Sequence, residues 1–399
     1  MKFTTVFDFP GAAAKPGVAL VKASDGNFYG TTNTEGAYGV GAIYRVTPQG
    51  QIATIYSFKG GSDGYSPSSS LLVGPDGNLW GTTSFNNDNT TYGTIYKVTL
   101  KGVLTTVHTF TGPDGRYPAT ELLNGGDGKL YGTVESGFSV GGSYPLYGAI
   151  YSITPSGTFK LAYSFKFADA GVAPMAGLIK GKDGFLYGTT SRTSSGFKGG
   201  SIFKFDPATS SLTTVYSFKP NSDGSAPGKI VQGKDGNFYG TTTTDGNGAS
   251  SGAKAFRVTP SGTFTVLHSF DTAANGYPSG VALVQASDGN FYGTCANGGK
   301  DGYGVVYRLT PSGTFAIVHA FPAVPVGVLT AALEGANPDA PLIDGGDGFL
   351  YGTTSNGAGD REIVFRGDGT VFKIALNGTF QLVAPFFSAP DGKDPHSAL

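Results

Sequence analysis

The chain has 399 residues, of which 39% are hydrophobic and 13% are aromatic, and its formal net charge at pH 7 is −1. So many apolar side chains are sufficient for a packed core and exclude an intrinsically disordered chain. Because the charges nearly cancel and the Lys and Arg residues are scattered, the sequence also argues against nucleic-acid binding. The 65 glycines follow no collagen-like period, so they indicate many short strands joined by tight turns.

The N-terminal segment from Lys2 to Phe9 has the pattern of a β-strand. It follows Met1 directly, without the apolar core of a signal peptide. The chain also lacks a run of about 18 apolar residues, so we expect no membrane span. Two interpretations of this start stay open: the protein is cytosolic, or a leader has been removed.

The eight residues from Asp25 to Thr32, DGNFYGTT, begin a repeat that organises the whole chain. Similar segments begin at Asp76, Asp127, Asp183, Asp235, Asp288 and Asp347. Successive copies are separated by 51 to 59 residues. A period near 50 residues, with only strand and turn signals inside it, is typical of propeller blades.

One repeat, from Gly177 to Phe218, shows the predicted elements of a blade. It contains an inner strand GLIKG, a turn KDGF, a second strand FLYGTTS, a third strand SIFKFD, a turn PATSS and a fourth strand SLTTVYSF. We therefore predict an all-β fold, a seven-bladed β-propeller with four-stranded antiparallel blades. Residues 1–399 would form this propeller as a single domain.

The turns and the strand glycine of each repeat have a specific chemistry. Asp-Gly supplies a residue at positive φ and a carboxylate that bonds nearby amides, and Thr-Pro-Ser-Gly, as at Thr154, completes the second reversal. Gly30 and its counterparts lie inside a strand, where we expect them to make room for the adjacent blade. We interpret the repeated Asp, Tyr and Thr as structural, because every blade needs the same turn and packing.

The C-terminal segment from Thr379 to Phe387 also matches the fourth strand of a blade. We expect a terminal strand to close the ring, and either this segment or Lys2 to Phe9 would serve. Residues 388–399 copy the start of a repeat, so they are either the beginning of a further repeat or a tail.

The loops of a propeller divide between two faces. The two hairpin turns of every blade share one face, which is uniform in this chain. The loops between second and third strands share the other face with the connections between blades, and we call it the variable-loop face because these loops differ between repeats. Variable loops on a rigid scaffold are where binding or catalysis is normally placed.

Tyrosines and charged side chains gather in the predicted loops of this face. Exposed tyrosines stack on sugar rings, and charged groups bond sugar hydroxyls, so a carbohydrate would suit this surface. The plainer interpretation, that loops are polar and Tyr is common in this chain, has equal weight. The predicted ligand-binding residues are Tyr38, Tyr92, Tyr144, Tyr147, Arg192, Tyr303 and Arg361.

Glutamates are the catalytic candidates. Glu35, Glu135 and Glu362 fall in the variable loops, whereas Glu121 and Glu334 fall in or just after connections between blades. Two carboxylates about 5 to 10 Å apart are sufficient for glycoside cleavage. A Tyr or Lys base would instead support elimination by a lyase. Candidate charge stabilisers for that reaction are Arg192, Lys198, Arg361 and Arg366.

Histidines and other singled-out residues favour structural roles. His108, His268 and His319 lie in predicted outer strands, which argues against a His-dependent triad or a His-ligated metal on the variable-loop face. Cys295 is expected to be a small packed side chain, and Trp80 to fill the position of the recurrent Tyr. A recurrent basic residue of the third strand is expected to pair with a carboxylate or with carbonyls; it is Arg45, Lys97, Lys204, Arg257, Arg308 and Lys373 in successive copies.

The sequence gives no reason to expect a cofactor. Asp360 to Asp368 lie in a loop whose carboxylates would be ligands for a structural calcium ion, but the loop lacks a regular spacing of oxygen ligands.

The pattern GxIYRVTPSGTFTxLYSF, followed by DGxxPxxxLVxGxDGNFYGTT, resembles the GloVer tandem-repeat family of bacterial proteins. The resemblance covers essentially the whole chain, and its two motifs recur in order. It implies secreted or cell-surface β-propeller repeats with interchangeable anchoring tails, and it offers no catalytic residues to transfer. DGNLWGTT at Asp76 also looks like strands of sensor propellers and streptogramin-lyase-type propellers, and that likeness concerns the fold alone.

Our leading hypothesis from the sequence is a secreted or cell-surface, non-catalytic binding propeller. Its partner would be a glycan, another surface polymer or a protein, recognised through the variable-loop face. The first alternative is a polysaccharide-active enzyme, a glycoside hydrolase or lyase that uses loop carboxylates. The second alternative is a structural or adhesin repeat module.

Overall fold

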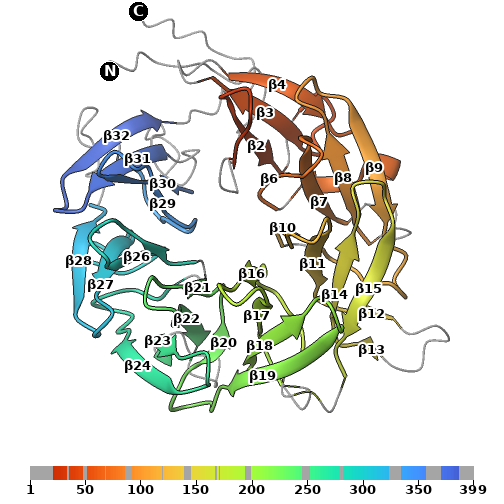
Figure 1. The fold of residues 1–399 in the computed structure, drawn as a ribbon. Helices are drawn as coiled ribbons and strands as arrows, with labels where there is room; N and C mark the ends of the chain where they lie inside the picture. Colours follow the sequence, from red (N-terminus) through yellow and green to blue (C-terminus); the bar gives the residue numbers. More distant parts are fainter. Residues whose placement is uncertain are drawn as a thin grey trace, which may run out of the picture.

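Seven antiparallel sheets follow one another along the chain and surround a central axis as the blades of a propeller (Figure 1). This computed structural model confirms the predicted all-β, seven-bladed fold with four main strands in each blade. It describes residues 21–33, 36–47, 52–67, 69–85, 92–118, 120–138, 145–166, 169, 171–193, 199–244, 252–278, 280, 282–322, 334–355 and 370–385.

The four strands of each blade run outward from the axis in chain order. Blade 1 contains β1 (Val21–Lys22), β2 (Phe28–Thr32), β3 (Ala42–Val46) and β4 (Ile52–Ser57). Blade 2 contains β6 (Leu72–Val73), β7 (Leu79–Phe85), β8 (Thr94–Val98) and β9 (Leu104–Thr109). Blade 3 contains β10 (Leu123–Asn124), β11 (Leu130–Val134), β14 (Ala149–Ile153) and β15 (Phe159–Ser164). Blade 4 contains β16 (Ile179–Lys180), β17 (Leu186–Thr190), β18 (Ser201–Asp206) and β19 (Ser211–Ser217). Blade 5 contains β21 (Val231–Gln232), β22 (Phe238–Thr244), β23 (Lys254–Val258) and β24 (Phe264–Ser269). Blade 6 contains β25 (Val284–Gln285), β26 (Phe291–Cys295), β27 (Val305–Leu309) and β28 (Phe315–Ala320). Blade 7 contains β29 (Ile343–Asp344), β30 (Phe349–Thr354), β31 (Thr370–Ala375) and β32 (Phe380–Pro385).

Several short elements accompany the blades. The strands β5 (Tyr65–Pro67) and β20 (Ser225–Pro227) pair with the second strands of blades 2 and 5. A two-stranded hairpin joins β12 (Gly137–Phe138) to β13 (Pro145–Leu146), and η1 (Gly61–Asp63) is a single 3₁₀ turn.

Each blade takes its four strands from one continuous stretch of chain. The last of them, β32, completes blade 7 and confirms the fourth-strand pattern predicted for Thr379 to Phe387. Lys2 to Phe9 and residues 388–399 lie outside the described residues. The inner strands have two residues each, fewer than GLIKG predicted, because only Ile179 and Lys180 oppose residues of the second strand.

A side-chain hydrogen bond fastens every first turn to its second strand. In six repeats the Tyr hydroxyl donates to the Asp four residues earlier at 2.7–2.8 Å, and in blade 2 the Nε1–H of Trp80 donates to Asp76 at 2.9 Å. The same Asp accepts the main-chain N–H two residues later, at 3.0–3.3 Å. These bonds confirm the structural interpretation of the repeated Asp and Tyr, and they confirm that Trp80 occupies the Tyr position.

The Asp–Tyr bond shifts the pKa of both partners. Burial alone would raise the pKa of Asp235, but the hydrogen bonds from Tyr239 and Asn237 outweigh it, so the pKa lies below its usual range. Burial and the neighbouring Asp235 carboxylate raise the pKa of Tyr239 to about 12. The carboxylate is therefore ionised and the phenol neutral at neutral pH, which is the combination that the bond requires.

The glycine of the second strand makes room within its own blade, so the expectation that it accommodates the adjacent blade is wrong. A Cβ placed on Gly188 would lie 2.5 Å from Cζ of Phe203, its cross-strand partner on the third strand. In other blades the same clash would involve the aromatic rings of Tyr96, Tyr151, Phe256, Tyr307 and Phe372. The glycine of the second strand and the ring of the third strand are directly paired residues, and the sequence pattern alone does not reveal this pairing.

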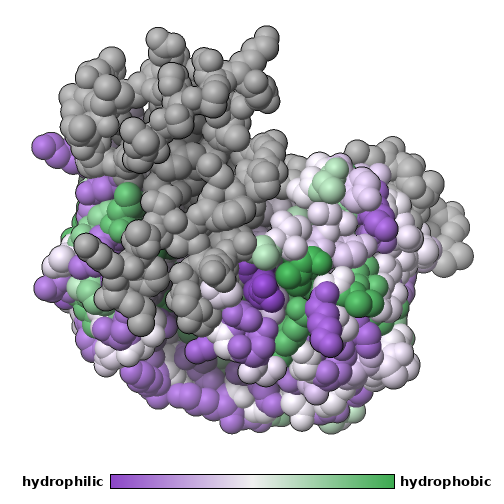
Figure 2. Space-filling view, turned by 90° about the horizontal axis from the view of Figure 1, so that it is seen from above, coloured by the Kyte–Doolittle hydropathy of each residue, from purple (hydrophilic) through white to green (hydrophobic). Residues whose placement is uncertain are grey.

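A repeated aromatic contact joins each described pair of successive blades. A Phe that follows the outer strand of one blade packs edge-on against the third-strand ring of the next, with centroids 5.0–5.5 Å apart. The six pairs are Phe58–Tyr96, Phe110–Tyr151, Phe165–Phe203, Phe218–Phe256, Phe270–Tyr307 and Phe321–Phe372. All twelve residues are buried, so the core is a series of apolar seams between blades. On the surface drawn in Figure 2, hydrophobic residues accordingly form scattered patches among hydrophilic ones.

Tyr239→Phe tests the contribution of the turn hydrogen bond. The substitution keeps the ring but removes the donor to Asp235, so we expect the free energy of unfolding at pH 7 to fall by about 1.5–2 kcal/mol in urea titrations. The folded-state pKa of Asp235 is lowered, so the stabilisation is present above the unfolded pKa of about 3.9 and is lost as pH falls through the folded value. The difference between variant and parent should therefore shrink in acid.

Tyr151→Phe is the matched control for that substitution. The buried hydroxyl of Tyr151 has no hydrogen-bond partner in the described part of the chain, so its removal should cost no stability. Equal losses in the two variants would show that the turn bond contributes nothing specific.

Gly188→Ala tests the space that the third-strand ring requires. The added methyl group would overlap Phe203, and we expect unfolding to become easier by about 1–3 kcal/mol, measured by thermal or urea unfolding. Repeating Gly188→Ala in a Phe203→Leu background should cost less, because the smaller side chain leaves room. An equal cost in both backgrounds would show that the Phe203 ring is not the obstacle and would point to Cδ2 of Leu178, which would lie 2.8 Å from the added methyl group.

Candidate functional site

The variable-loop face is described in part. Its loops include residues 34–35, 86–91, 139–144, 194–198, 245–251 and 356–369, which lie outside the described residues. The predicted residues Glu35, Tyr144, Lys198, Arg361, Glu362 and Arg366 are among them, as are Asp360 to Asp368 of the calcium loop. The geometry of the face therefore comes from the remaining predicted residues and their neighbours.

The predicted tyrosines differ in how much of their side chains reaches solvent. Tyr38 is 58% exposed and Tyr303 is 40% exposed, so their rings are available at the surface. Tyr92 and Tyr147 are half-buried and pack against the apolar seams beside blades 2 and 3.

Three of these tyrosines occupy the same position, directly before the glycine that precedes a third strand. Each of their carbonyls accepts an N–H from the connection that enters the following blade, at 2.8–2.9 Å. The bonded pairs are Tyr92 with Tyr117, Tyr147 with Ala173 and Tyr303 with Asn337. The main chain of these tyrosines thus fixes the seam, while the side chains differ in exposure.

Glu135 and Arg192 form an ion pair between blades 3 and 4. Each residue follows the end of a second strand, β11 or β17, and Nη2 of Arg192 donates to Oε1 of Glu135 at 2.8 Å. The two side chains are 30% and 29% exposed, respectively. The fold thus brings together two residues that the sequence singled out separately, one as an acid/base candidate and the other as a ligand-binding residue.

A second arginine lies next to this pair. Nε of Arg116 donates to the hydroxyl of Ser136 at 2.9 Å, and its guanidinium lies 5.2 Å from the ring centroid of Tyr117. The ring of Tyr117 is 37% exposed. We call Arg116, Tyr117, Glu135, Ser136 and Arg192 the blade 3/4 patch.

Glu121 and Lys229 form an ion pair that spans an entire blade. Glu121 lies in the connection into blade 3 and Lys229 in the connection into blade 5, each two residues before an inner strand. Between them lies Gly177 of blade 4, where an added Cβ would approach the Glu121 carboxylate to 2.5 Å. Because blade 4 separates these blades everywhere farther out, the pair must lie on the axial side of the ring. We call Glu121 and Lys229 the axial pair.

The sequence prediction missed Lys229 and Arg116. At the position of Lys229 the other described repeats have Ser70, Glu121, Gly177, Ala282 and Pro341. An alignment of the repeats at this position shows two opposite charges among uncharged residues. These opposite charges come together because the ring brings the inner ends of blades 3 and 5 close to each other.

These ion pairs are suited to binding neighbouring hydroxyl groups. Each pair presents carboxylate acceptors beside N–H donors, which matches the donors and acceptors of adjacent sugar hydroxyls. Each side chain of the two pairs is 29–31% exposed, so a ligand at the surface would reach it. The exposed ring of Tyr117 supplies an apolar surface nearby.

The histidines lie in the outer strands, as predicted. Each ring stacks on a Phe of the next blade's outer strand, as His108 does on Phe159 at a centroid distance of 3.7 Å. Nε2 of His108 bonds Asp114 at 2.9 Å, and Nε2 of His319 bonds Glu334 at 3.0 Å.

Cys295 and two of the basic third-strand residues also fulfil their predicted roles. Cys295 is fully buried. Lys97 and Lys204 pair with the turn carboxylates of Asp76 and Asp183.

The described residues offer no metal site. None of their His, Cys, Asp and Glu side chains form a group of three that would hold an ion. In the same part of the chain, no helix is long and apolar enough to span a membrane.

A double-mutant cycle of Glu121→Gln and Lys229→Met tests the axial pair. Because both side chains are about one-third exposed, we expect a coupling of about 0.2–1 kcal/mol in the free energy of unfolding at low ionic strength. The coupling should decrease at 1 M salt. Zero coupling at low salt would contradict the pairing.

Comparison with known proteins places the chain among propellers. The profile of a family described as the Gloeobacter/Verrucomicrobia repeat matches residues 1–179, 138–333 and 256–399. A search of curated proteins gave no match.

Two solved structures are similar to the chain in fold. The periplasmic gluconolactonase of Pseudomonas aeruginosa has a TM-score of 0.57 and 18% identity, covering 91% of this chain and 98% of its own. A puromycin hydrolase has a TM-score of 0.59 and 13% identity over 98% of this chain, which spans 57% of the hydrolase chain. At such identities the likeness establishes the propeller fold and nothing about activity.

Proposed function

The chain belongs to the Gloeobacter/Verrucomicrobia repeat family, and on that premise we propose that it is a non-catalytic propeller that binds a glycan through its variable-loop face. We further propose that it acts outside the bacterial cell or on its surface, as the sequence resemblance implies. The observation that carries the proposal is the occurrence of two interblade ion pairs, Glu135–Arg192 and Glu121–Lys229, in one sector of that face.

The position of these pairs favours recognition of an extended ligand. Glu135–Arg192 joins blades 3 and 4, and the axial pair joins blades 3 and 5, so together they cover three consecutive blades. The exposed ring of Tyr117 lies in the same sector. A glycan of several residues would bond its hydroxyls to the pairs and stack one sugar ring on Tyr117.

The bonding of the carboxylates supports binding over cleavage. Glycoside hydrolysis requires one carboxyl group that gives up a proton and a second carboxylate across the glycosidic bond. In the described residues Glu121 and Glu135 are each bonded to a cationic side chain. Each pair already engages one carboxylate oxygen with a cation, an arrangement that suits holding a hydroxyl group.

A polysaccharide panel tests this function. Purified protein is incubated with each polymer, and retention of the protein and release of soluble product are measured in the same tubes. We expect retention without release. Release of reducing ends or unsaturated sugars would show an enzyme, and absence of both would favour a structural or protein-binding module.

Arg192→Leu and Lys229→Met locate the binding surface. Each variant should weaken binding to the retained polymer about tenfold, a loss of roughly 1.4 kcal/mol in binding free energy. Lys160→Met is the control, because Lys160 is exposed on the outer strand of blade 3, away from this face. Retained affinity in both site variants would overturn the assignment of the face.

A further inference from the structure

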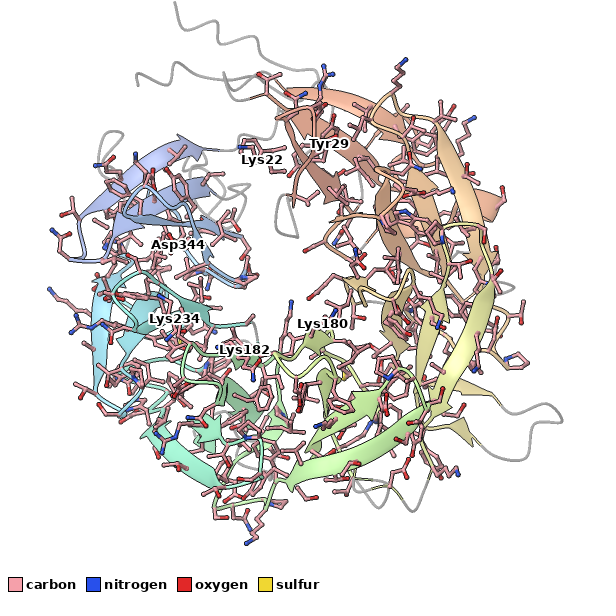
Figure 3. The ribbon with its side chains drawn as sticks, in the orientation of Figure 1. Lys22, Tyr29, Lys180, Lys182, Lys234 and Asp344 are labelled. Atoms are coloured by element: carbon pink, nitrogen blue, oxygen red, sulfur yellow. The ribbon has the colours of Figure 1, made fainter. Side chains whose placement is uncertain are left out.

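Four lysines surround the axis at the opposite end of the ring, where the Asp-Gly turns lie. Lys22 belongs to β1 and Lys180 to β16, each as the second residue of an inner strand, whereas Lys182 and Lys234 directly precede the Asp-Gly turns of blades 4 and 5. All four side chains are exposed. Figure 3 shows them, together with Asp344, around the inner side of the ring.

Three of these ammonium groups lie at seams between blades. Nζ of Lys182 donates to the carbonyls of Gly233 and Lys234, both at 3.0 Å, and Nζ of Lys234 donates to the carbonyl of Ala286 at 3.3 Å. Nζ of Lys180 lies beside Gly126 of blade 3, where an added Cβ would be 2.4 Å from it. A carbonyl oxygen orients an ammonium group but carries no net charge. These hydrogen bonds therefore leave the positive charges of Lys182 and Lys234 in place.

The carboxylates of the same turns are directed away from the axis. Asp183 is bonded to Tyr187 on the second strand and to Lys204 on the third strand, and both strands lie outside the inner strand. Asp235 is bonded in the same way to Tyr239. Within the seven described inner strands, the acidic side chain is Asp344 alone. Within the described inner strands and the residues directly before the Asp-Gly turns, four side chains are positively charged and one is negatively charged.

We propose that this turn-side mouth of the propeller binds the anionic groups of an acidic polysaccharide. The lysines occupy three adjacent seams and a position on blade 1, so their charges are distributed around the rim and suit a chain with several charges better than one small anion. The described inner strands consist of Val, Leu, Ile, Lys, Asn, Gln and Asp, without the aromatic rings on which nucleic-acid bases stack. This site goes beyond the proposed function, because it lies on the other face and uses different residues.

The test measures binding of the full chain to immobilised polygalacturonate, dextran sulfate, uncharged dextran and oligothymidylate at 50 and 500 mM salt. We expect binding to one or both acidic polysaccharides, a decrease of at least tenfold at high salt, and no binding to dextran through this face. The carboxylated and sulfated polymers distinguish which anionic group is preferred. Tighter binding of oligothymidylate than of either polysaccharide would overturn the proposal.

Charge-matched variants distinguish the rim from the rest of the surface. Lys180→Ala/Lys182→Ala/Lys234→Ala should lose at least tenfold in affinity for the acidic polymer. The control removes the same charge from exposed lysines elsewhere, Lys59→Ala/Lys101→Ala/Lys160→Ala, and should change affinity less than twofold. Equal losses in the two sets, or no loss in the first, would overturn the proposal.

A second variant keeps the test valid if the first set disturbs the turns. Among the described residues neither the Lys22 nor the Lys180 side chain donates a hydrogen bond, and Nζ of Lys22 lies 5.8 Å from the ring centroid of Phe28. Lys22→Ala/Lys180→Ala should therefore fold normally and still weaken binding at least threefold. Unchanged affinity in this folded variant would count against the site. Arg192→Leu should leave binding of the acidic polymer unchanged, so failure of this proposal is distinguishable from failure of glycan binding at the variable-loop face.

Discussion

The contact between the Phe that follows each outer strand and the third-strand ring of the next blade is the interaction on which the rest of this structure depends. It recurs with nearly constant geometry at the six described seams, from Phe58–Tyr96 to Phe321–Phe372. In blades 2 to 7 the glycine of the second strand leaves room for that ring, and a bond from Tyr, or from Trp80 in blade 2, to the turn Asp holds the same strand to its turn. Because successive blades meet through rigid aromatic surfaces, the angle between them is fixed, and the loops above have a stable base.

The two ends of the propeller axis carry different kinds of charged groups. The variable-loop end carries oppositely charged pairs, Glu121–Lys229 and Glu135–Arg192, whose donors and acceptors are balanced. The turn end carries lysines whose partners are carbonyls of neighbouring turns, such as Lys182 with Gly233. A neutral hydroxylated ligand suits the first arrangement and an anionic ligand the second, although both are built on the same repeat.

Much of the fold is readable from the sequence, because the repeat encodes local geometry. Asp-Gly turns, the 50-residue period and the strand patterns predict seven four-stranded blades, and Trp80 and Cys295 occupy the places expected for them. The function of Gly188 was misjudged because it depends on the register between strands, which sets its ring partner. The axial pair joins residues 108 positions apart, so it becomes visible only when the ring places blades 3 and 5 on either side of Gly177. Side chains in the variable loops have no repeat to constrain them, so the sequence does not predict which of them lie together.

The continuity of each blade along the chain has a consequence for how such a protein changes over evolutionary time. A single segment of gene encodes all four strands of a blade together with the ring that receives the preceding Phe and the Phe that engages the next ring. Duplication or recombination of one such segment therefore inserts a unit whose two sides already fit its neighbours. Loops on the variable face then diverge without disturbing those sides, so new recognition surfaces arise by copying a blade and altering its loops.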